Sequence, residues 1–314
     1  MTFRMMTKII ENSKNNPLVS VIIPNYNYAR YLDQRMESIL SQTYQNYEVI
    51  ILDDKSTDNS VEIIQKYKSH PRVAKVIINE TNSGSPFKQW ERGINEASGE
   101  IIWIAESDDF CTPDLLETLV NLYVENNCVL AFCRSIFVDK NGKTIGDSSQ
   151  MAEVDADITM EGKFFIKKYL AYYNEIQNAS CAIFSKTAAM EIDKHFTDFK
   201  GAGDWFFWIN LAEHGIVSFS NKKCNRYRQH NNTTLKVVKN GMEFREMKTI
   251  YEWLLYHSYL DEVQFEKCKT SDLSYLTSRE DIPINVKIKL YRMWNMPLKH
   301  IISMCILEFR RKLK

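Results

Sequence analysis

Four consecutive residues, Glu106-Ser107-Asp108-Asp109, have side chains suited to binding a cation or a phosphorylated ligand. They follow an apolar run, residues 100–105, that is typical of a buried strand. Neighbouring carboxylates at the end of such a strand are costly unless a cation meets them. A hard ion, Mg²⁺ or Mn²⁺, would meet them because carboxylate oxygens suit such ions. The alternative is a solvated turn that caps the next helix, since Thr112-Pro113-Asp114 is a good helix start.

Short apolar runs alternate with amphipathic stretches through the first third of the chain. The pattern predicts strands at residues 19–23, 48–52, 74–78 and 100–105, separated by helices at 30–41, 56–67 and 87–97. This alternation favours an α/β fold with a mostly parallel, doubly wound sheet. Ligands bind outside the carboxyl ends of the strands in such sheets. Three polar clusters fall at those ends, at residues 24–27, 53–54 and 107–109. Scattered surface acids would not follow strand ends, so the placement indicates a site.

The composition is that of a soluble globular protein, with 314 residues of which 44% are hydrophobic and 25% charged. Lys+Arg and Asp+Glu both number 40, so no global charge bias points to nucleic acid. The seven cysteines are scattered, which favours a reduced, cytoplasmic setting over a disulfide framework or a zinc site. We expect no signal peptide in residues 1–16, and the apolar stretch at 301–307 is too short to span a bilayer.

Beyond residue 128 the pattern becomes less regular. It predicts a strand at 129–138, helices at 161–173 and 203–214, and further helices from about residue 240. We therefore expect an N-terminal tail (1–16), a catalytic domain (17–235) and a helical C-terminal extension (236–314).

Five motifs in order make the chain resemble the family 2 glycosyltransferases, which have the GT-A fold. They are Val-Ser-Val-Ile-Ile-Pro-Asn-Tyr-Asn (19–27), Ser-Ile-Leu-Ser-Gln-Thr-Tyr (38–44), Leu-Asp-Asp-Lys-Ser-Thr-Asp (52–58), Ala-Ser-Gly-Glu (97–100) and Glu-Ser-Asp-Asp (106–109). The resemblance implies transfer of a sugar from a nucleotide-diphosphate donor, UDP above all, to an acceptor hydroxyl, with inversion and a divalent metal. It also implies bacterial surface polysaccharide assembly on a saccharide or lipid-linked acceptor. The Gln-x-x-Arg-Trp signature of processive synthases is absent, so we expect addition of a single sugar.

On the donor side, the resemblance implies that Pro24 and Tyr26 lie along the nucleotide base, where the Tyr26 ring can stack. A turn with a surface tyrosine is the alternative. Asp54 would accept a hydrogen bond from a uracil-type N–H, whereas Asp53 is expected to fix the loop. Lys88 stands near the place of a basic residue that meets the nucleotide in the family, although the usual Arg-Asn pair is absent. A solvated helix lysine is the alternative.

For the metal, the resemblance implies that Asp108 holds the ribose and assists the ion while Asp109 ligates it. The ion would be Mn²⁺ or Mg²⁺. The first position of the motif is usually Asp, and we expect Glu106 in its place not to be a direct ligand. Arg228 and His230 would reach the diphosphate and the metal, respectively. The alternative is a basic surface loop.

The resemblance implies that Asp204 is the general base that deprotonates the acceptor. Many family members have Glu-Asp here, and Gly203-Asp204 leaves the orientation of the acceptor in question. A helix N-cap is the alternative role of Asp204. The aromatic residues that follow are expected in the core, with Trp205 as a candidate beside the base. Asn178-Ala179-Ser180 is a further candidate for the acceptor side.

The segment after Pro283 is basic and has an apolar stripe that includes Leu298, Ile302 and Cys305. Such a helix can lie on an anionic membrane surface, which predicts a peripheral location on the inner face of the cytoplasmic membrane. The alternative is a helix docked on its own catalytic domain. Two rival functions are a nucleotidyltransferase, which would need a Gly-rich basic loop after the first strand, and a nucleotide-sugar-binding subunit without catalysis.

Overall fold

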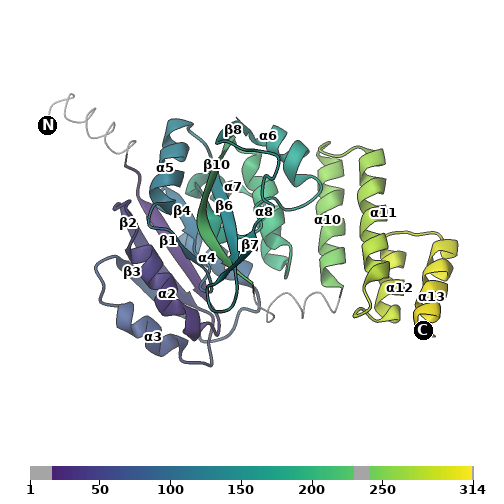
Figure 1. Cartoon of the computed structure of the whole chain (residues 1–314), viewed down its shortest axis with the longest axis horizontal. Coiled ribbons are helices and arrows are strands. Elements are labelled where there is room, and N and C mark those ends of the chain that lie inside the picture. The colour runs from purple at the N-terminus through teal and green to yellow at the C-terminus, as the bar shows by residue number, and fades with distance from the viewer. Residues whose placement is uncertain (1–15, 230–240, 313–314) are drawn as a thin grey trace.

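Ten strands form one mixed sheet in the computed structural model, which describes residues 16–229 and 241–312 (Figure 1). The strands are β1 (Val19–Asn25), β2 (Tyr47–Asp53), β3 (Val73–Ile78), β4 (Ile101–Ile104), β5 (Phe110–Cys111), β6 (Leu130–Val138), β7 (Thr144–Asp147), β8 (Ile158–Glu161), β9 (Ala182–Ser185) and β10 (Ile216–Arg228). Their order is β3-β2-β1-β4-β9-β6-β10-β5, with β7 paired to β6 and β8 paired to β10.

The first half of the sheet is parallel, as the alternation of strands and helices predicts. β1 pairs in parallel with β2 and β4, and β2 pairs in parallel with β3. Every residue of β1 and β4 is buried, because both faces of these strands are covered. β9 is antiparallel to β4 and β6, so the second half of the sheet is mixed.

The helices lie between and after the strands. They are α2 (Ala29–Leu40), α3 (Ser60–Tyr67), α4 (Pro86–Glu96), α5 (Leu115–Glu125), α6 (Gly162–Phe165), α7 (Lys186–Glu191), α8 (Gly203–Ala212), α10 (Met242–Tyr256), α11 (Glu262–Ser278), α12 (Ile284–Met293) and α13 (Leu298–Lys312). The helix predicted at 161–173 is shorter than expected. It consists of α6 and a π-helical segment, Ile166–Leu170, that follows it directly, and it ends there.

Helix α8 is apolar on all sides and lies inside the protein. Phe206, Phe207 and Trp208 are at most 1% exposed, which places these aromatic side chains in the core. Trp205 is also buried, and its indole N–H donates to the Leu170 carbonyl at 2.8 Å. Trp205 is therefore a core residue in this structure.

Four helices, α10 to α13, stand together at one end of the molecule (Figure 1). Aromatic contacts join α10 to α8, with the Trp205 and Tyr251 ring centroids 5.8 Å apart and those of Phe206 and Trp253 also 5.8 Å apart. The boundary predicted near Leu235 falls outside the described residues. Among the described helices, none is long and apolar enough to cross a membrane.

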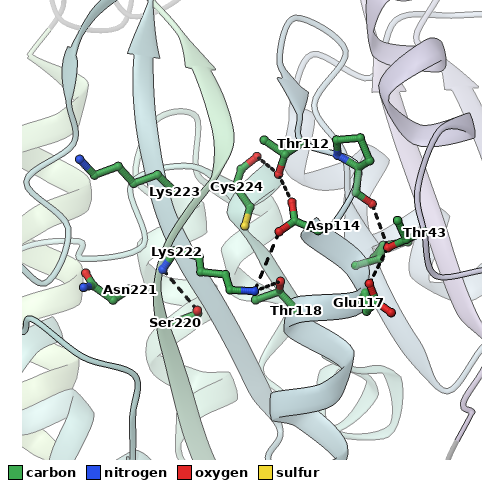
Figure 2. A network of polar contacts seen from close by, with 12 residues as sticks. Thr43, Thr112, Asp114, Glu117, Thr118, Ser220, Asn221, Lys222, Lys223 and Cys224 are labelled. Carbon is green, nitrogen blue, oxygen red and sulfur yellow. Dashed lines mark hydrogen bonds and ion pairs between the residues drawn. The ribbon is translucent and has the colours of Figure 1, made fainter.

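A polar network fixes the segment that follows the acidic cluster (Figure 2). Thr112 donates to the Asp114 carboxylate at 2.6 Å and to the Cys224 carbonyl of β10 at 3.4 Å. Lys222, in the irregular part of β10, donates to the Thr118 hydroxyl on α5 at 3.3 Å. The start of α5 is thereby held against β10, which limits the positions that the acidic cluster can take.

Candidate active site

The carboxyl ends of β1 and β2 meet at one edge of the sheet, where Asn25 lies opposite Asp53. The Asn25 side-chain amide donates to Asp53 at 2.8 Å, and the other Asp53 carboxylate oxygen accepts the Ser56 backbone N–H at 2.9 Å. Asp53 thus fixes the loop after β2. Pro24 is buried in β1, whereas Tyr26, just beyond the strand, is 47% exposed and presents its ring to solvent at this edge.

Asp54 is buried within a dense set of hydrogen bonds. It accepts from the Asn79 amide at 2.6 Å, from the Gln89 amide at 3.0 Å and from the Ser83 hydroxyl at 2.8 Å. These bonds, with the Ser83 backbone N–H, occupy both carboxylate oxygens. Asp54 therefore orders the segment between β3 and α4, and its contact with a base remains a prediction.

A hollow of about 500 Å³ opens beside Asp54. Three of the residues that line it, Asn79, Ser83 and Gln89, are the hydrogen-bond donors to Asp54. The exposed Lys88 lines the same hollow. The structure thus brings Lys88 and the partners of Asp54 together around a space open to a ligand.

Asp109 is held from three directions at the centre of the acidic cluster. One carboxylate oxygen accepts from the Asn178 amide and the Ser180 hydroxyl, both at 2.8 Å. The other accepts the Arg228 backbone N–H at 2.9 Å. These donors come from the 3₁₀ turn before β9 and from β10, so distant parts of the chain fix this carboxylate.

Carboxylates crowd one another around Asp109. Burial, reinforced by the charge of Asp108, raises the pKa of Asp109 to about 7. The same two causes, in the same order, raise the pKa of Glu106 to about 8. Glu106 accepts the Trp90 indole N–H at 2.9 Å, so its longer side chain already has a partner on α4. Such crowding is relieved when a cation binds.

The divalent cation expected at the acidic cluster remains a prediction. Among the described residues, no group of three or more His, Cys, Asp or Glu side chains is placed to hold a metal. Mg²⁺ commonly takes only one or two carboxylates and completes its shell with water and substrate phosphates. Asp108 and Asp109 can supply such a pair. His230, the predicted third ligand, lies outside the described residues.

Arg228 is buried and directs its guanidinium into the protein. Its donors reach the Asp108 carbonyl at 2.6 Å, the Asp139 carbonyl at 3.0 Å and the Gln34 side chain at 2.6 Å. It also stacks on the Tyr31 ring at 4.4 Å. The structure therefore shows Arg228 supporting the acidic cluster from behind, and a contact with the diphosphate remains a prediction.

Asp204 stands in the first turn of α8 and is only partly exposed. Its carboxylate accepts from the Asn174 amide at 2.9 Å and from the Trp205 backbone N–H at 2.8 Å. Burial raises the pKa of Asp204 to about 7. A carboxylate with a pKa near neutrality is well matched to general-base catalysis.

Tyr227 joins the base side of the site to the acidic cluster. After burial, the charges of Asp109, Asp204 and Asp108 are the causes that raise the pKa of its phenol. The three predicted acids are therefore all near enough to this side chain of β10 to act on its phenol through their charge. They lie at the same edge of the sheet although almost a hundred residues separate the cluster from Asp204.

The loop before Asp204 is fixed by the C-terminal helices. Glu246 of α10 is 7% exposed and accepts the backbone N–H groups of Lys200, Gly201 and Ala202 at 2.6, 2.9 and 2.7 Å. Gly203 has no room for a side chain, since an added Cβ would lie 2.6 Å from the Phe87 ring. A Glu at this position would therefore not fit without a shift of its neighbours.

Two residues near the site, Gln89 and Trp90 on α4, were not predicted from the sequence; they donate to Asp54 and Glu106. Asn178 and Ser180, predicted as candidates for the acceptor side, donate to Asp109, and a contact with the acceptor remains a prediction. The sequence signal for α4 was a pair of neighbouring side chains with N–H donors, an amide and an indole, in the helix that follows β3. No local signal connects Asn178 to Asp109.

Comparison with known proteins identifies the class. The family model described as "Glycosyl transferase family 2" matches residues 20–193, more than half of the chain. The chain therefore belongs to the family 2 glycosyltransferases, as its motifs predict. A glycosyltransferase of Haemophilus influenzae, named only as uncharacterized, is 36% identical over 151 residues, which are 48% of this chain and 60% of that relative. The match thus spans less than two thirds of that relative.

Two further proteins share more of this chain's length. TuaG of Bacillus subtilis, a glycosyltransferase provisionally assigned to teichuronic acid biosynthesis, is 25% identical over 218 residues, or 69% of this chain and 81% of TuaG. The crystal structure of S. aureus TarS 1-349 in complex with UDP-GlcNAc superposes with a TM-score of 0.63 and 21% identity, covering 80% of this chain and 70% of that one. This likeness confirms the predicted GT-A fold.

Proposed function

We propose that this glycosyltransferase moves a single sugar from a UDP-sugar to an acceptor hydroxyl, with inversion, in surface polysaccharide biosynthesis. One observation supports the proposal most: Asp109, at the carboxyl end of the strand region, and Asp204, in the first turn of α8, are each held in place by hydrogen bonds from distant parts of the chain. The UDP-GlcNAc bound by TarS and the assignment of TuaG support the donor and the pathway.

In this mechanism the donor base lies between Tyr26 and the Asp54 segment, and Lys88 meets the nucleotide from α4. Asp108 and Asp109 would hold Mn²⁺ or Mg²⁺, an ion that would supply positive charge to stabilise the leaving diphosphate. Asp109 keeps its orientation because Asn178, Ser180 and the Arg228 backbone fix both of its oxygens. His230 and the Arg228 guanidinium are the further residues that we assign to the metal and diphosphate.

Asp204 removes the acceptor proton as the new bond forms to the anomeric carbon. Its raised pKa makes it a stronger base than a solvated aspartate, and the Asn174 amide holds one oxygen in place. The acceptor is a saccharide or a lipid-linked saccharide, met at the inner face of the cytoplasmic membrane. Opposite positions of base and leaving group give inversion.

A donor assay tests the function directly. Thermal shift across several nucleotide sugars, each with and without Mn²⁺, identifies the donor, because a bound ligand raises the apparent stability. We expect UDP-sugars to stabilise the protein in the presence of the metal, followed by slow hydrolysis of the donor. Binding without any hydrolysis or transfer would instead favour a nucleotide-sugar-binding subunit, and no binding of any UDP-sugar would contradict the proposal.

A further inference from the structure

Helix α13 stands at the end of the molecule (Figure 1) and has an apolar stripe of exposed side chains. Its residues Leu298, Ile302, Ile306 and Phe309 are 68, 51, 47 and 65% exposed. Their spacing of three or four residues puts them on one side of the helix. Ile301 and Met304, on another side, are buried. Packing within the described chain therefore accounts for one side of α13 and leaves the stripe uncovered.

The charged residues of α12 and α13 are mostly basic. Residues 283–312 contain one acidic residue, Glu308. Glu308 is buried and accepts from the equally buried Lys287 at 2.6 Å, so its charge is neutralised inside the protein. Lys289, Arg292 and Lys299 are exposed. In the described part of α12 and α13, the exposed surface thus combines apolar side chains with cations and presents no exposed carboxylate.

We infer that this surface of α12 and α13 docks on an anionic lipid bilayer. A helix with an apolar stripe and basic neighbours lies in the plane of the interface, with the stripe in the acyl boundary and the cations among anionic headgroups. A second copy of the chain fits less well. A two-fold contact through the stripe would bring the same cations face to face, and like charges across an interface are unfavourable.

The biological role of this docking rests on the proposed function, because an enzyme that glycosylates a lipid-linked acceptor must work beside the membrane. The docking itself depends only on the surface of α12 and α13. Vesicle binding and donor hydrolysis can therefore be measured on the same preparation, and each can fail without the other.

The test is co-sedimentation of the full chain with vesicles of phosphatidylcholine alone and of phosphatidylcholine with phosphatidylglycerol. We expect binding to the anionic vesicles at low salt and weaker binding as salt rises. Ile302→Glu places a charge in the stripe and should lower the partition coefficient at least about tenfold. Arg292→Gln and Lys299→Gln should each lower it about fivefold, the change expected for one cation near an anionic surface.

Val263→Glu is the matched control, since it makes a similar substitution at an apolar residue of α11 that is 79% exposed. It should bind like the unmodified chain. Light scattering measures the oligomeric state of the unmodified chain and of Ile302→Glu. Absence of binding to anionic vesicles at low salt, or equal binding by Ile302→Glu and Val263→Glu, would overturn the inference. So would an oligomer that Ile302→Glu dissociates without any effect on vesicle binding, because the stripe would then be an interface between copies.

Discussion

At the scale of single residues, the site depends on carboxylates that are costly to keep. Asp109 and Asp204 are both buried enough that their pKa values rise to about 7. Asp109 is compensated by three protein donors and Asp204 by two. Such groups lower the stability of the free protein, and buried carboxylates with shifted pKa values are typical of functional sites, which agrees with the roles that we propose for them.

The first prediction concerns Asp109→Asn. The variant keeps the size of the side chain and removes a buried charge, although its amide nitrogen leaves at least one of the three donors without an acceptor. The fold should therefore remain with a modest loss of stability, while metal-dependent binding of UDP is lost. Titration calorimetry of UDP with and without Mn²⁺ measures this. Asp147→Asn, at an exposed aspartate bonded to Lys223, is a control that should bind as the unmodified chain does. Unchanged affinity in Asp109→Asn would remove Asp109 from the metal site.

The second prediction concerns Asp204→Asn and the chemical step. A positioned general base contributes roughly 10²–10⁴-fold, so single-turnover transfer should slow by that range while donor affinity stays the same. Since Asp204 must be ionised to act, the rate of the unmodified enzyme should rise as pH increases through about 7. If the variant keeps most of its rate, Asp204 is only a helix-terminal residue.

A third prediction follows from the same pKa through stability. The folded-state pKa of Asp204 lies above its ordinary value of 3.8, so its stabilising effect is present at low pH and is lost as pH rises through about 7. Asp204→Asn removes a charge that is unfavourable above this pH. Its unfolding midpoint in urea should therefore exceed that of the unmodified chain at pH 8, and the difference should shrink at pH 5. A constant difference across this range would contradict the raised pKa.

At the scale of elements, local patterns predicted the strands and helices of the first half well. β1, β2 and α2 follow from short β-branched runs and helical spacing, and the parallel order places their polar ends together. The antiparallel insertion of β9 between β4 and β6 could not be read from the sequence, because it depends on long-range pairing. The same holds for the site: motifs identified Asp109, but Asn178 and Ser180 reach it only through that pairing.

The link between α10 and the loop before α8 is another feature without a local signal. Glu246 accepts three backbone N–H groups there, so the C-terminal helices help to position Asp204. The Asn174 side-chain amide, thirty residues earlier in the chain, donates a hydrogen bond to the Asp204 carboxylate. These contacts fix both the loop and the Asp204 carboxylate, next to a Gly203 that has no room for a side chain.

Glu246→Ala should therefore affect both stability and catalysis. The substitution leaves three backbone N–H groups without their acceptor, and each unsatisfied buried donor costs about 1–3 kcal/mol. Water that enters the gap can satisfy part of this need, so we expect the total loss of unfolding free energy to be about 2–4 kcal/mol. The transfer rate should fall as the loop moves. Glu252→Ala, at an exposed residue of the same helix that pairs with Lys248, should change stability by less than about 1 kcal/mol. Equal effects of the two substitutions in urea unfolding would show that Glu246 does not hold the loop.

At the scale of the whole molecule, charge is balanced in number but not in position. The 40 basic and 40 acidic residues give no net charge, yet residues 283–312 contain only one acid. The sheet collects carboxylates at its ligand edge, and the far helices collect cations. This separation follows from the different ligands that we assign to the two ends, a metal with a diphosphate and an anionic surface.

The C-terminal helices differ in how they are attached to the rest of the protein. α10 packs on α8 through aromatic rings and Glu246, whereas α12 and α13 are held to each other by the buried Lys287–Glu308 pair. Removing one partner of a buried ion pair costs about 3–5 kcal/mol. Arg311 lies 3.3 Å from Glu308 and can still neutralise its charge, so Lys287→Met should cost about 3 kcal/mol. The loss should be local. Hydrogen exchange should show faster opening of α12 and α13 while β1 and α8 keep their protection, and Lys287→Met combined with Glu308→Leu should restore it. If β1 lost protection to the same extent as α13, the helical end and the sheet would instead unfold as one cooperative unit.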